Sequence, residues 1–197
     1  MRKILVLLMV VMFAAGNMYA QQDNLKGKSL KEIEKEQKRA AKEAKKAAEE
    51  AEENRLFEQA VQALDGRDFV IEAERVEFKR GNYVYVTPST NFVKVEGDNA
   101  TVQLSFNVPA SGPNGIGGIT LDGKTSDVKI VKDKKGNVTY EMFVQGAALS
   151  ARLVVKVTNG TSRCTATVYP NFNSNRVSFS GRLYPSSEST IFKGRSI

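Results

Sequence analysis

From Asp68 onward, apolar and polar residues alternate with a period of two along most of the chain. Val102, Leu104 and Phe106, for example, are separated by single polar residues. Because successive side chains of a strand point to opposite faces, this period predicts strands that bury one face and expose the other. The expected strands cover residues 69–78, 82–87, 91–96, 101–106, 127–132, 138–144, 147–158, 161–169 and 176–184, with a further strand-like segment from Ile119.

Short turn sequences connect several of these strands. Gly97-Asp98-Asn99, Lys135-Gly136-Asn137 and Asn159-Gly160 have the composition of hairpin turns. Hairpins pair neighbouring strands antiparallel. We therefore expect a mostly β fold, a small antiparallel β-barrel or sandwich for which a lipocalin-like meander is one form, preceded by a long N-terminal α-helix.

The turn at residues 159–160 allows the register of one hairpin to be predicted. A two-residue turn pairs Thr158 with Thr161, and this register places Val155 opposite Cys164 on an apolar face. Cys164 is therefore predicted to be a buried core thiol and not a nucleophile.

The other face of the same hairpin is basic. The predicted register puts Lys156 opposite Arg163. Arg152, Arg176 and Arg182 have the matching phase on the same strand or the next one. Like charges in opposite positions repel, although solvent screens them strongly. Two interpretations stay open: a solvated face without a ligand, or an anion-binding face that docks a phosphorylated glycolipid or an acidic glycan of the cell envelope.

A glycine-rich loop, residues 109–118, is a second candidate for ligand contact. Its glycines permit positive φ angles, and free amides in such a loop can line a nest for an anion. The candidate contacts are Asn114, Gly115, Gly117 and Gly118. A nucleotide site is not expected, because no helix follows and the P-loop lysine is missing. The alternative is a structural loop that shapes one end of the barrel.

The first twenty residues have the pattern of a secretory signal peptide. Arg2 and Lys3 precede an apolar run, residues 4–15, and small or neutral residues lead to Ala20, after which we expect cleavage. The apolar run is too short to span a membrane, so no transmembrane segment is expected after cleavage. Cys164 is the only cysteine, which excludes a lipoprotein cleavage site. We expect an exported protein of the periplasm or the outer-membrane surface.

A charged helical extension, residues 21–54, precedes a β domain at residues 55–197. Ser29 and Glu32 form a capping box, and no glycine or proline follows until Gly66. The apolar stripe of the extension is mostly alanine, which buries little area. A solvated spacer and weak self-association both remain open. From residue 56 to residue 64 the helix has an amphipathic face that is expected to pack on the β domain.

Composition excludes several classes of function. The chain has no histidine and a single cysteine, so no metal site and no cofactor are predicted, and most hydrolase schemes lack their base. The formal charge is +7, from which signal cleavage removes two positive charges. Residues 21–67 hold eleven basic and eleven acidic side chains, so the remaining excess lies on the β domain. Because export separates the chain from nucleic acid, no nucleic-acid partner is expected.

Two stretches, residues 112–123 (GPNGIGGITLDG) and residues 179–194 (FSGRLYPSSESTIFKG), together with residues 69–76 (FVIEAERV), resemble the DUF4251 family of exported Bacteroidetes proteins. The resemblance covers about residues 55–197. It implies the same compartment and a β fold. Because the function of this family is unknown, it implies no active residue.

The leading hypothesis is a non-enzymatic binding or interaction module that holds an apolar or anionic envelope molecule, a lipid or a glycan. One alternative is a structural protein that oligomerises through the N-terminal helix. The other is a hydrolase that uses two carboxylates, for which Glu72, Glu74 and Glu141 are the strand acids to consider.

Overall fold

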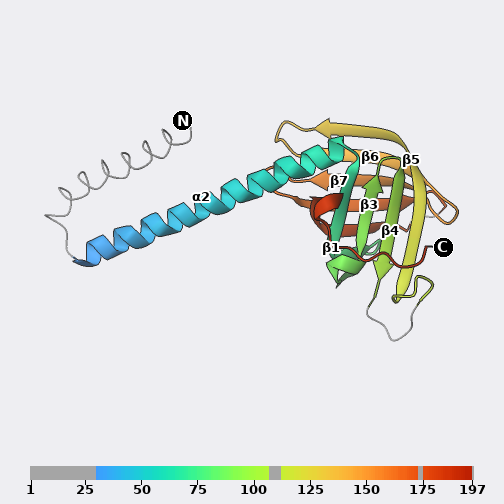
Figure 1. Ribbon diagram of the computed structural model, residues 1–197, viewed down its shortest axis with the longest axis horizontal. Helices are drawn as coiled ribbons and strands as arrows, with labels where there is room; N and C mark the ends of the chain where they lie inside the picture. The colour runs from blue at the N-terminus through green and yellow to red at the C-terminus, as the bar shows by residue number, and fades with distance from the viewer. Residues whose placement is uncertain (1–29, 107–111, 173–174, 197) are drawn as a thin grey trace, which may run out of the picture. The chain divides into compact units, whose positions relative to one another are not determined.

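The computed structural model describes residues 30–106, 112–172 and 175–196 (Figure 1). The predicted signal peptide and Ser29 of the predicted capping box lie outside these residues. Contacts divide the chain into two compact units, one up to Glu49 and one from Glu50 onward. Each unit is described by itself below.

Helix α2 (Leu30–Asp65) accounts for the described part of the first unit and for the beginning of the second. In the first unit its side chains are exposed, apart from the half-buried Ile33. In the second unit Phe57 and Leu64 are buried in the core of the β domain. The long N-terminal helix is thus confirmed, whereas its roles as a spacer or in self-association stay predictions.

Eight antiparallel strands form a closed barrel. Each strand pairs with its neighbour along the chain, and the last strand pairs with the first. The barrel strands are β1 (Asp68–Phe78), β3 (Phe92–Glu96), β4 (Asn99–Ser105), β5 (Gly118–Lys132), β6 (Val138–Gln145), β7 (Ser150–Val157), β8 (Arg163–Pro170) and β9 (Val177–Pro185). An extra strand, β2 (Tyr83–Tyr85), pairs with the end of β1, and short helical turns lie at η2 (Pro88–Thr90) and η3 (Ser186–Glu188). The predicted antiparallel β fold is confirmed, in its barrel form with meander connections.

The alternating pattern fails in one strand, where the backbone is irregular. Residues 127–132 and the segment from Ile119 belong to the single strand β5. Its register with β6 shifts between Ser126 and Lys129, and Asp127 has a positive φ of 52°. This β-bulge interrupts the period of two, so the sequence pattern divides one long strand into two.

Large side chains fill the middle of the barrel. Phe69, Tyr140, Met142 and Phe179 have no exposed surface, and the rings of Phe69 and Tyr140 make an edge-to-face contact with centroids 5.3 Å apart. A side chain that lined a ligand-sized cavity would keep accessible surface toward that cavity. The middle of the barrel, as far as the structure describes it, is therefore packed solid. Burial of each of these side chains contributes about 1.5–3 kcal/mol to folding.

The predicted burial of Cys164 is confirmed, but the predicted register of its hairpin is wrong. Cys164 lies opposite Val157, and Lys156 lies opposite Thr165, a slip of two residues from the expected pairing. The connection is a four-residue loop, residues 159–162, because the amide of Thr158 donates to the carbonyl of Arg163 (3.1 Å), while the carbonyl of the buried Ser162 accepts a hydrogen bond from the amide of Leu183 of β9 (2.9 Å). A slip of two preserves the faces of a strand, so the thiol is still buried, and burial raises its pKa.

A C-terminal strap, residues 186–196, lies against the outer surface of the barrel (Figure 1). Its amides at Phe192 and Arg195 donate to the carbonyls of Ser89 (2.7 Å) and Asn114 (3.0 Å). The strap covers outward-facing residues of the strands, so that Gln103 of β4 is fully buried although it points away from the barrel interior.

Candidate binding surface

The solid interior directs the search for a site to the outer surface. The five predicted basic residues all lie on or next to β7, β8 and β9. Four of them are exposed and one is half-buried. The exposed residues are Arg152, Lys156, Arg163 and Arg176, and the half-buried one is Arg182.

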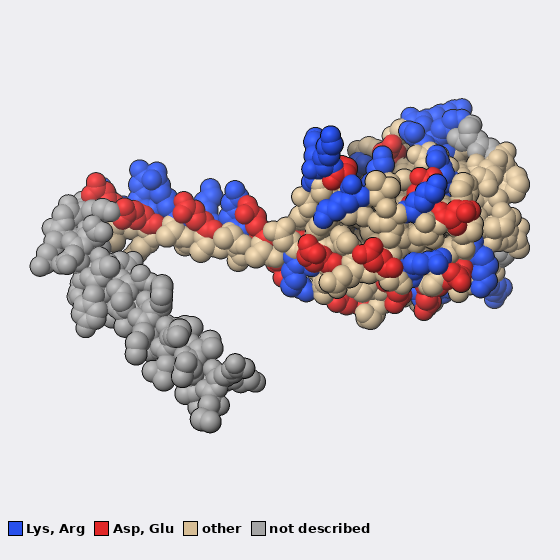
Figure 2. Space-filling view, turned by 90° about the horizontal axis from the view of Figure 1, so that it is seen from above, with Lys and Arg blue, Asp and Glu red and all other residues tan. Residues whose placement is uncertain are grey.

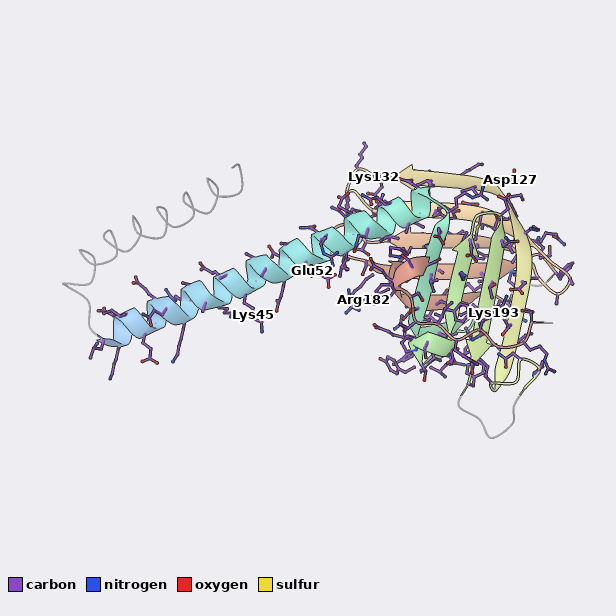
Figure 3. All side chains as sticks on the ribbon, viewed as in Figure 1. Lys45, Glu52, Asp127, Lys132, Arg182 and Lys193 are labelled. Atoms are coloured by element: carbon purple, nitrogen blue, oxygen red, sulfur yellow. The ribbon has the colours of Figure 1, made fainter. Side chains whose placement is uncertain are left out.

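Carboxylates pair with some of these basic residues, so the surface is not uniformly positive. Arg182, labelled in Figure 3, forms an ion pair with Glu53 of α2 (Nη2 to Oε1, 3.0 Å). Arg152 forms one with Glu141 (3.3 Å). Arg163 lies directly opposite Arg182 in the sheet. The carboxylate of Glu74 on β1 lies 4.0 Å from the guanidinium of Arg163. A pair of like charges thus occurs, although not between the predicted partners. Figure 2 shows Lys and Arg interspersed with Asp and Glu over the face that it presents.

Sequence reasoning missed Glu53 as a partner of this surface, because 129 positions separate it from Arg182. Both oxygens of its carboxylate accept hydrogen bonds from the guanidinium of Arg182, and the hydroxyl of Thr161 donates to Oε2 (2.7 Å). These bonds, from Arg182 first and from Thr161 second, lower the pKa of Glu53. The same pair raises the pKa of Arg182.

We expect Glu53→Gln to destabilise the protein at neutral pH but not in acid. A carboxylate with a lowered pKa stabilises the folded state above its ordinary pKa of 4.5, and this contribution is lost as the pH falls through the lowered value. Since 35% of the Glu53 side chain is exposed, solvent limits the difference at pH 7 to less than about 1 kcal/mol. Urea unfolding of both proteins from pH 7 to pH 3 measures it. Glu58→Gln, at an exposed position of the same helix, is the control, and a difference that persisted at pH 3 would contradict the assignment.

Phe143, Arg152 and Tyr169 form a row across three adjacent strands on the outer surface. Arg152 lies opposite Phe143 of β6 on one side and opposite Tyr169 of β8 on the other. Its guanidinium carbon lies 5.0 Å from the centroid of the Tyr169 ring, and 41% of Phe143 is exposed. We call these three residues the Phe143–Arg152–Tyr169 row. Phe143 stands in the polar phase of its strand, which is the sequence signal by which the row could have been found.

Lys156 adds a cation beside this row. Lys156 points outward from β7, as Arg152 does four residues earlier. It lies between Thr139 and Thr165 of the neighbouring strands. It is exposed, and it has no ion-pair partner among the residues that the structure describes. The outer surface of β6, β7 and β8 thus offers two aromatic rings, one shared guanidinium and one free ammonium group.

The glycine-rich loop lies elsewhere, between β4 and β5, and several amides of its described part, residues 112–118, are occupied. Asn114 is buried, and its side-chain oxygen accepts hydrogen bonds from the amides of Ile116 (3.0 Å) and Gly118 (2.9 Å). The amide of Gly115 donates to the carbonyl of Gly112 (3.2 Å). The structure does not bring the loop together with the basic residues, and these three amides already have acceptors within the protein.

The three strand acids, Glu72, Glu74 and Glu141, each interact with different residues. Glu72 accepts hydrogen bonds from the hydroxyl of Ser189 (2.7 Å) and the amide of Thr190 (3.2 Å) in the strap. Glu141 pairs with Arg152, as described above, and the carboxylate of Glu74 lies 4.0 Å from the guanidinium of Arg163. Each acid therefore has a different basic or polar neighbour.

Described residues line two hollows on the surface of the barrel. One, of about 600 Å³, lies beside β2, and the described residues along it are uncharged, among them Tyr85, Phe106 and Ile116. The other, of about 460 Å³, is polar, and Asp122 lies in it, where it accepts hydrogen bonds from Lys193 of the strap (2.8 Å). Neither hollow includes a residue of the predicted basic surface.

Comparisons with known proteins identify relatives but no activity. None of the described helices combines the length and the apolarity required to cross a membrane. No curated protein matches the chain. A crystal structure of a DUF4251 family protein from Bacteroides eggerthii is similar to it, with 45% identity and a TM-score of 0.62 over 75% of this chain and 99% of that one. The model of a domain of unknown function, DUF4251, matches residues 51–183, more than half of the chain, so the resemblance is confirmed and the chain belongs to the DUF4251 family.

Proposed function

We propose that this protein is a non-enzymatic interaction module of the bacterial cell envelope that binds an acidic glycan on the outer surface of β6, β7 and β8. The Phe143–Arg152–Tyr169 row is the observation that carries this proposal. The envelope location rests on the signal-peptide pattern of residues 1–20.

The chemistry of the row supports a glycan more than a lipid. Aromatic residues and arginine are the types enriched where proteins bind partners, because they offer a large contact area with a polar or charged group at its edge. The rings of Phe143 and Tyr169 provide apolar surface for sugar carbons, and Arg152 and Lys156 provide donors for a carboxylate or phosphate. An acyl chain needs an enclosed apolar cavity, and the filled interior leaves no such space in its described part.

The pairing of Arg152 with Glu141 is compatible with this function. The two side chains are 44% and 35% exposed, so their ion pair is worth little and an incoming anion can compete for the guanidinium. Glu141 also repels an anion that covers the whole row. The row therefore favours a ligand with widely spaced acidic groups more than a ligand with a uniformly charged surface.

Titration calorimetry with oligogalacturonate, and with its neutral methyl ester as the matched ligand, tests the proposal. We expect the mature protein to bind the acid and not the ester. Arg152→Gln is expected to weaken binding roughly tenfold or more, since a charge-assisted hydrogen bond contributes about 1.5–3 kcal/mol. Phe143→Ala is expected to have an effect of about the same size, because it removes apolar surface that sugar carbons would cover. Arg80→Gln, which removes an exposed arginine from the turn before β2, is the matched control.

Two results would overturn the proposal. One is an equal loss of affinity in Arg80→Gln and Arg152→Gln, which would indicate attraction to net charge alone. The other is the absence of binding to any member of a panel of uronate, sulfated and phosphorylated glycans.

A further inference from the structure

The described part of the first unit carries its basic residues on one face of α2. Successive residues of an α-helix turn by about 100°, and at this angle all seven basic residues between positions 31 and 46 fall within a sector of about 120°. These residues are Lys31, Lys35, Lys38, Arg39, Lys42, Lys45 and Lys46. We call this sector the basic face of α2. Figure 2 shows Lys and Arg along one side of this segment, and Figure 3 labels Lys45.

The other residues of the segment are segregated as well. The side opposite the basic face holds Ile33 and alanines, including Ala40, Ala44 and Ala47. Glu32, Glu34, Glu36 and Glu43 lie between the two sides, whereas Glu49 lies within the basic sector beyond Lys46. The pattern is that of an amphipathic helix whose apolar side is small. The linear order of the residues hides this separation, because basic and acidic residues follow one another closely along the chain.

Acidic neighbours pair with part of the basic face. Lys38 pairs with Glu34 (2.6 Å) and Lys45 with Glu49 (3.8 Å), and Lys46 also has an interaction partner. The four side chains are between 62% and 78% exposed, so each pair is worth only about 0.3–0.5 kcal/mol and exchanges readily for another anion. The lysines of these two pairs therefore remain available to a partner that presents several negative charges at once.

We infer that the basic face of α2 is a docking surface for the headgroups of an anionic phospholipid bilayer. The face is straight and about 22 Å long from Lys31 to Lys46, so a flat anionic surface engages all of its cations together. Each lysine or arginine close to such a surface contributes about 1 kcal/mol of attraction. The opposite, alanine-rich side buries too little area to draw the helix into the hydrocarbon, so the helix binds at the headgroups without inserting.

This inference uses residues that the proposed glycan site does not. It rests on the proposed function only for its envelope location, which brings the chain close to bilayers. Binding of glycans to the barrel and binding of the helix to lipid are expected to be separable by mutation.

Cosedimentation of the mature full-length protein with lipid vesicles tests the inference. We expect binding to vesicles of equal parts phosphatidylglycerol and phosphatidylcholine at low salt, weakening as salt screens the charges, and no binding to pure phosphatidylcholine. The triple variant Lys35→Gln, Lys38→Gln and Lys42→Gln is expected to lower the partition coefficient roughly hundredfold, as the loss of three contributions of about 1 kcal/mol each implies. Glutamine is nearly as good a helix former as lysine, and circular dichroism at 222 nm verifies that α2 is retained.

A matched triple variant removes the same charge from the barrel. Lys129→Gln, Lys132→Gln and Lys134→Gln replaces three exposed lysines at the end of β5 and in the turn after it, and is expected to bind vesicles within about twofold of the unmodified protein. An equal loss in both triple variants would overturn the basic face as the docking surface. Failure to bind phosphatidylglycerol vesicles, with or without binding to the soluble polyanion heparin, would overturn the bilayer as its partner. Arg152→Gln is expected to bind vesicles normally, which keeps this result independent of the glycan experiment.

Discussion

Replacing Gln103 with leucine is expected to lower the free energy of unfolding by about 2–4 kcal/mol, because the change leaves several buried polar groups without partners. The amide nitrogen of Gln103 donates to the carbonyls of Thr90 (3.0 Å) and Phe192 (2.8 Å). Its amide oxygen accepts from the hydroxyl of Thr120 (2.8 Å) and the backbone amide of Gly194 (2.8 Å). The amide group therefore makes the two donor and two acceptor bonds that a glutamine side chain can make.

Leucine has a similar volume but can replace none of these bonds. Gln103 is fully buried, so water cannot take over its role without opening the structure. Two of its four partners belong to the strap, and we expect the strap to detach locally in the variant. Hydrogen exchange at the amides of Phe192 and Gly194, both of which donate to the barrel surface, would report this detachment.

Urea unfolding measures the global effect, and thermal unfolding should show a midpoint lower by roughly 5–15 °C for a unit of this size. Gln62→Leu makes the same chemical change at an exposed position of α2 and is expected to alter stability by less than about 0.5 kcal/mol. If the two variants were equally stable, the hydrogen-bond network around Gln103 would not hold the strap.

Replacing Gly181 with alanine is also expected to destabilise the protein, because it obstructs the closure of the barrel. Gly181 lies on β9 opposite Ala73 of β1, next to the bulge at which the register of these two strands shifts. A Cβ atom at this glycine would overlap the backbone carbonyl oxygen of Glu72. Because the obstacle is backbone and not a flexible side chain, the seam between β1 and β9 must move apart. Overpacking of this kind costs about 1–3 kcal/mol, and more where strand pairing is lost.

The yield of soluble folded protein and its urea midpoint measure this effect. Ser180→Ala, a change at the adjacent outward-facing residue of the same strand, is the control and is expected to cost less than about 1 kcal/mol. An alanine variant as stable as the original protein would mean that the two strands do not approach as closely at this point as the structure places them.

Local sequence pattern determines most elements of this protein, because such an element depends mainly on neighbouring residues; β5, with its bulge, is an exception. The absence of glycine and proline between Gly27 and Gly66 allows helix α2 to continue to Asp65. The period of two identifies the strands and which of their faces is buried. For the same reason the burial of Cys164 follows from its phase alone, even though its predicted partner across the hairpin was wrong.

Only the tertiary structure decides which elements meet, because those contacts join residues far apart in the chain. Ser162 hydrogen-bonds to Leu183 of β9 and belongs to the loop of the β7–β8 hairpin, whose register differs by two residues from the one that the turn sequence predicts. The pairing of Glu53 with Arg182 turns part of a basic surface into an ion pair across 129 positions. The filled interior likewise depends on how side chains from all eight strands meet in one volume. The alternation of apolar and polar residues is a property of each strand, whereas register, charge pairing and packing are properties of the closed barrel. Register, charge pairing and packing together decide where a ligand can bind.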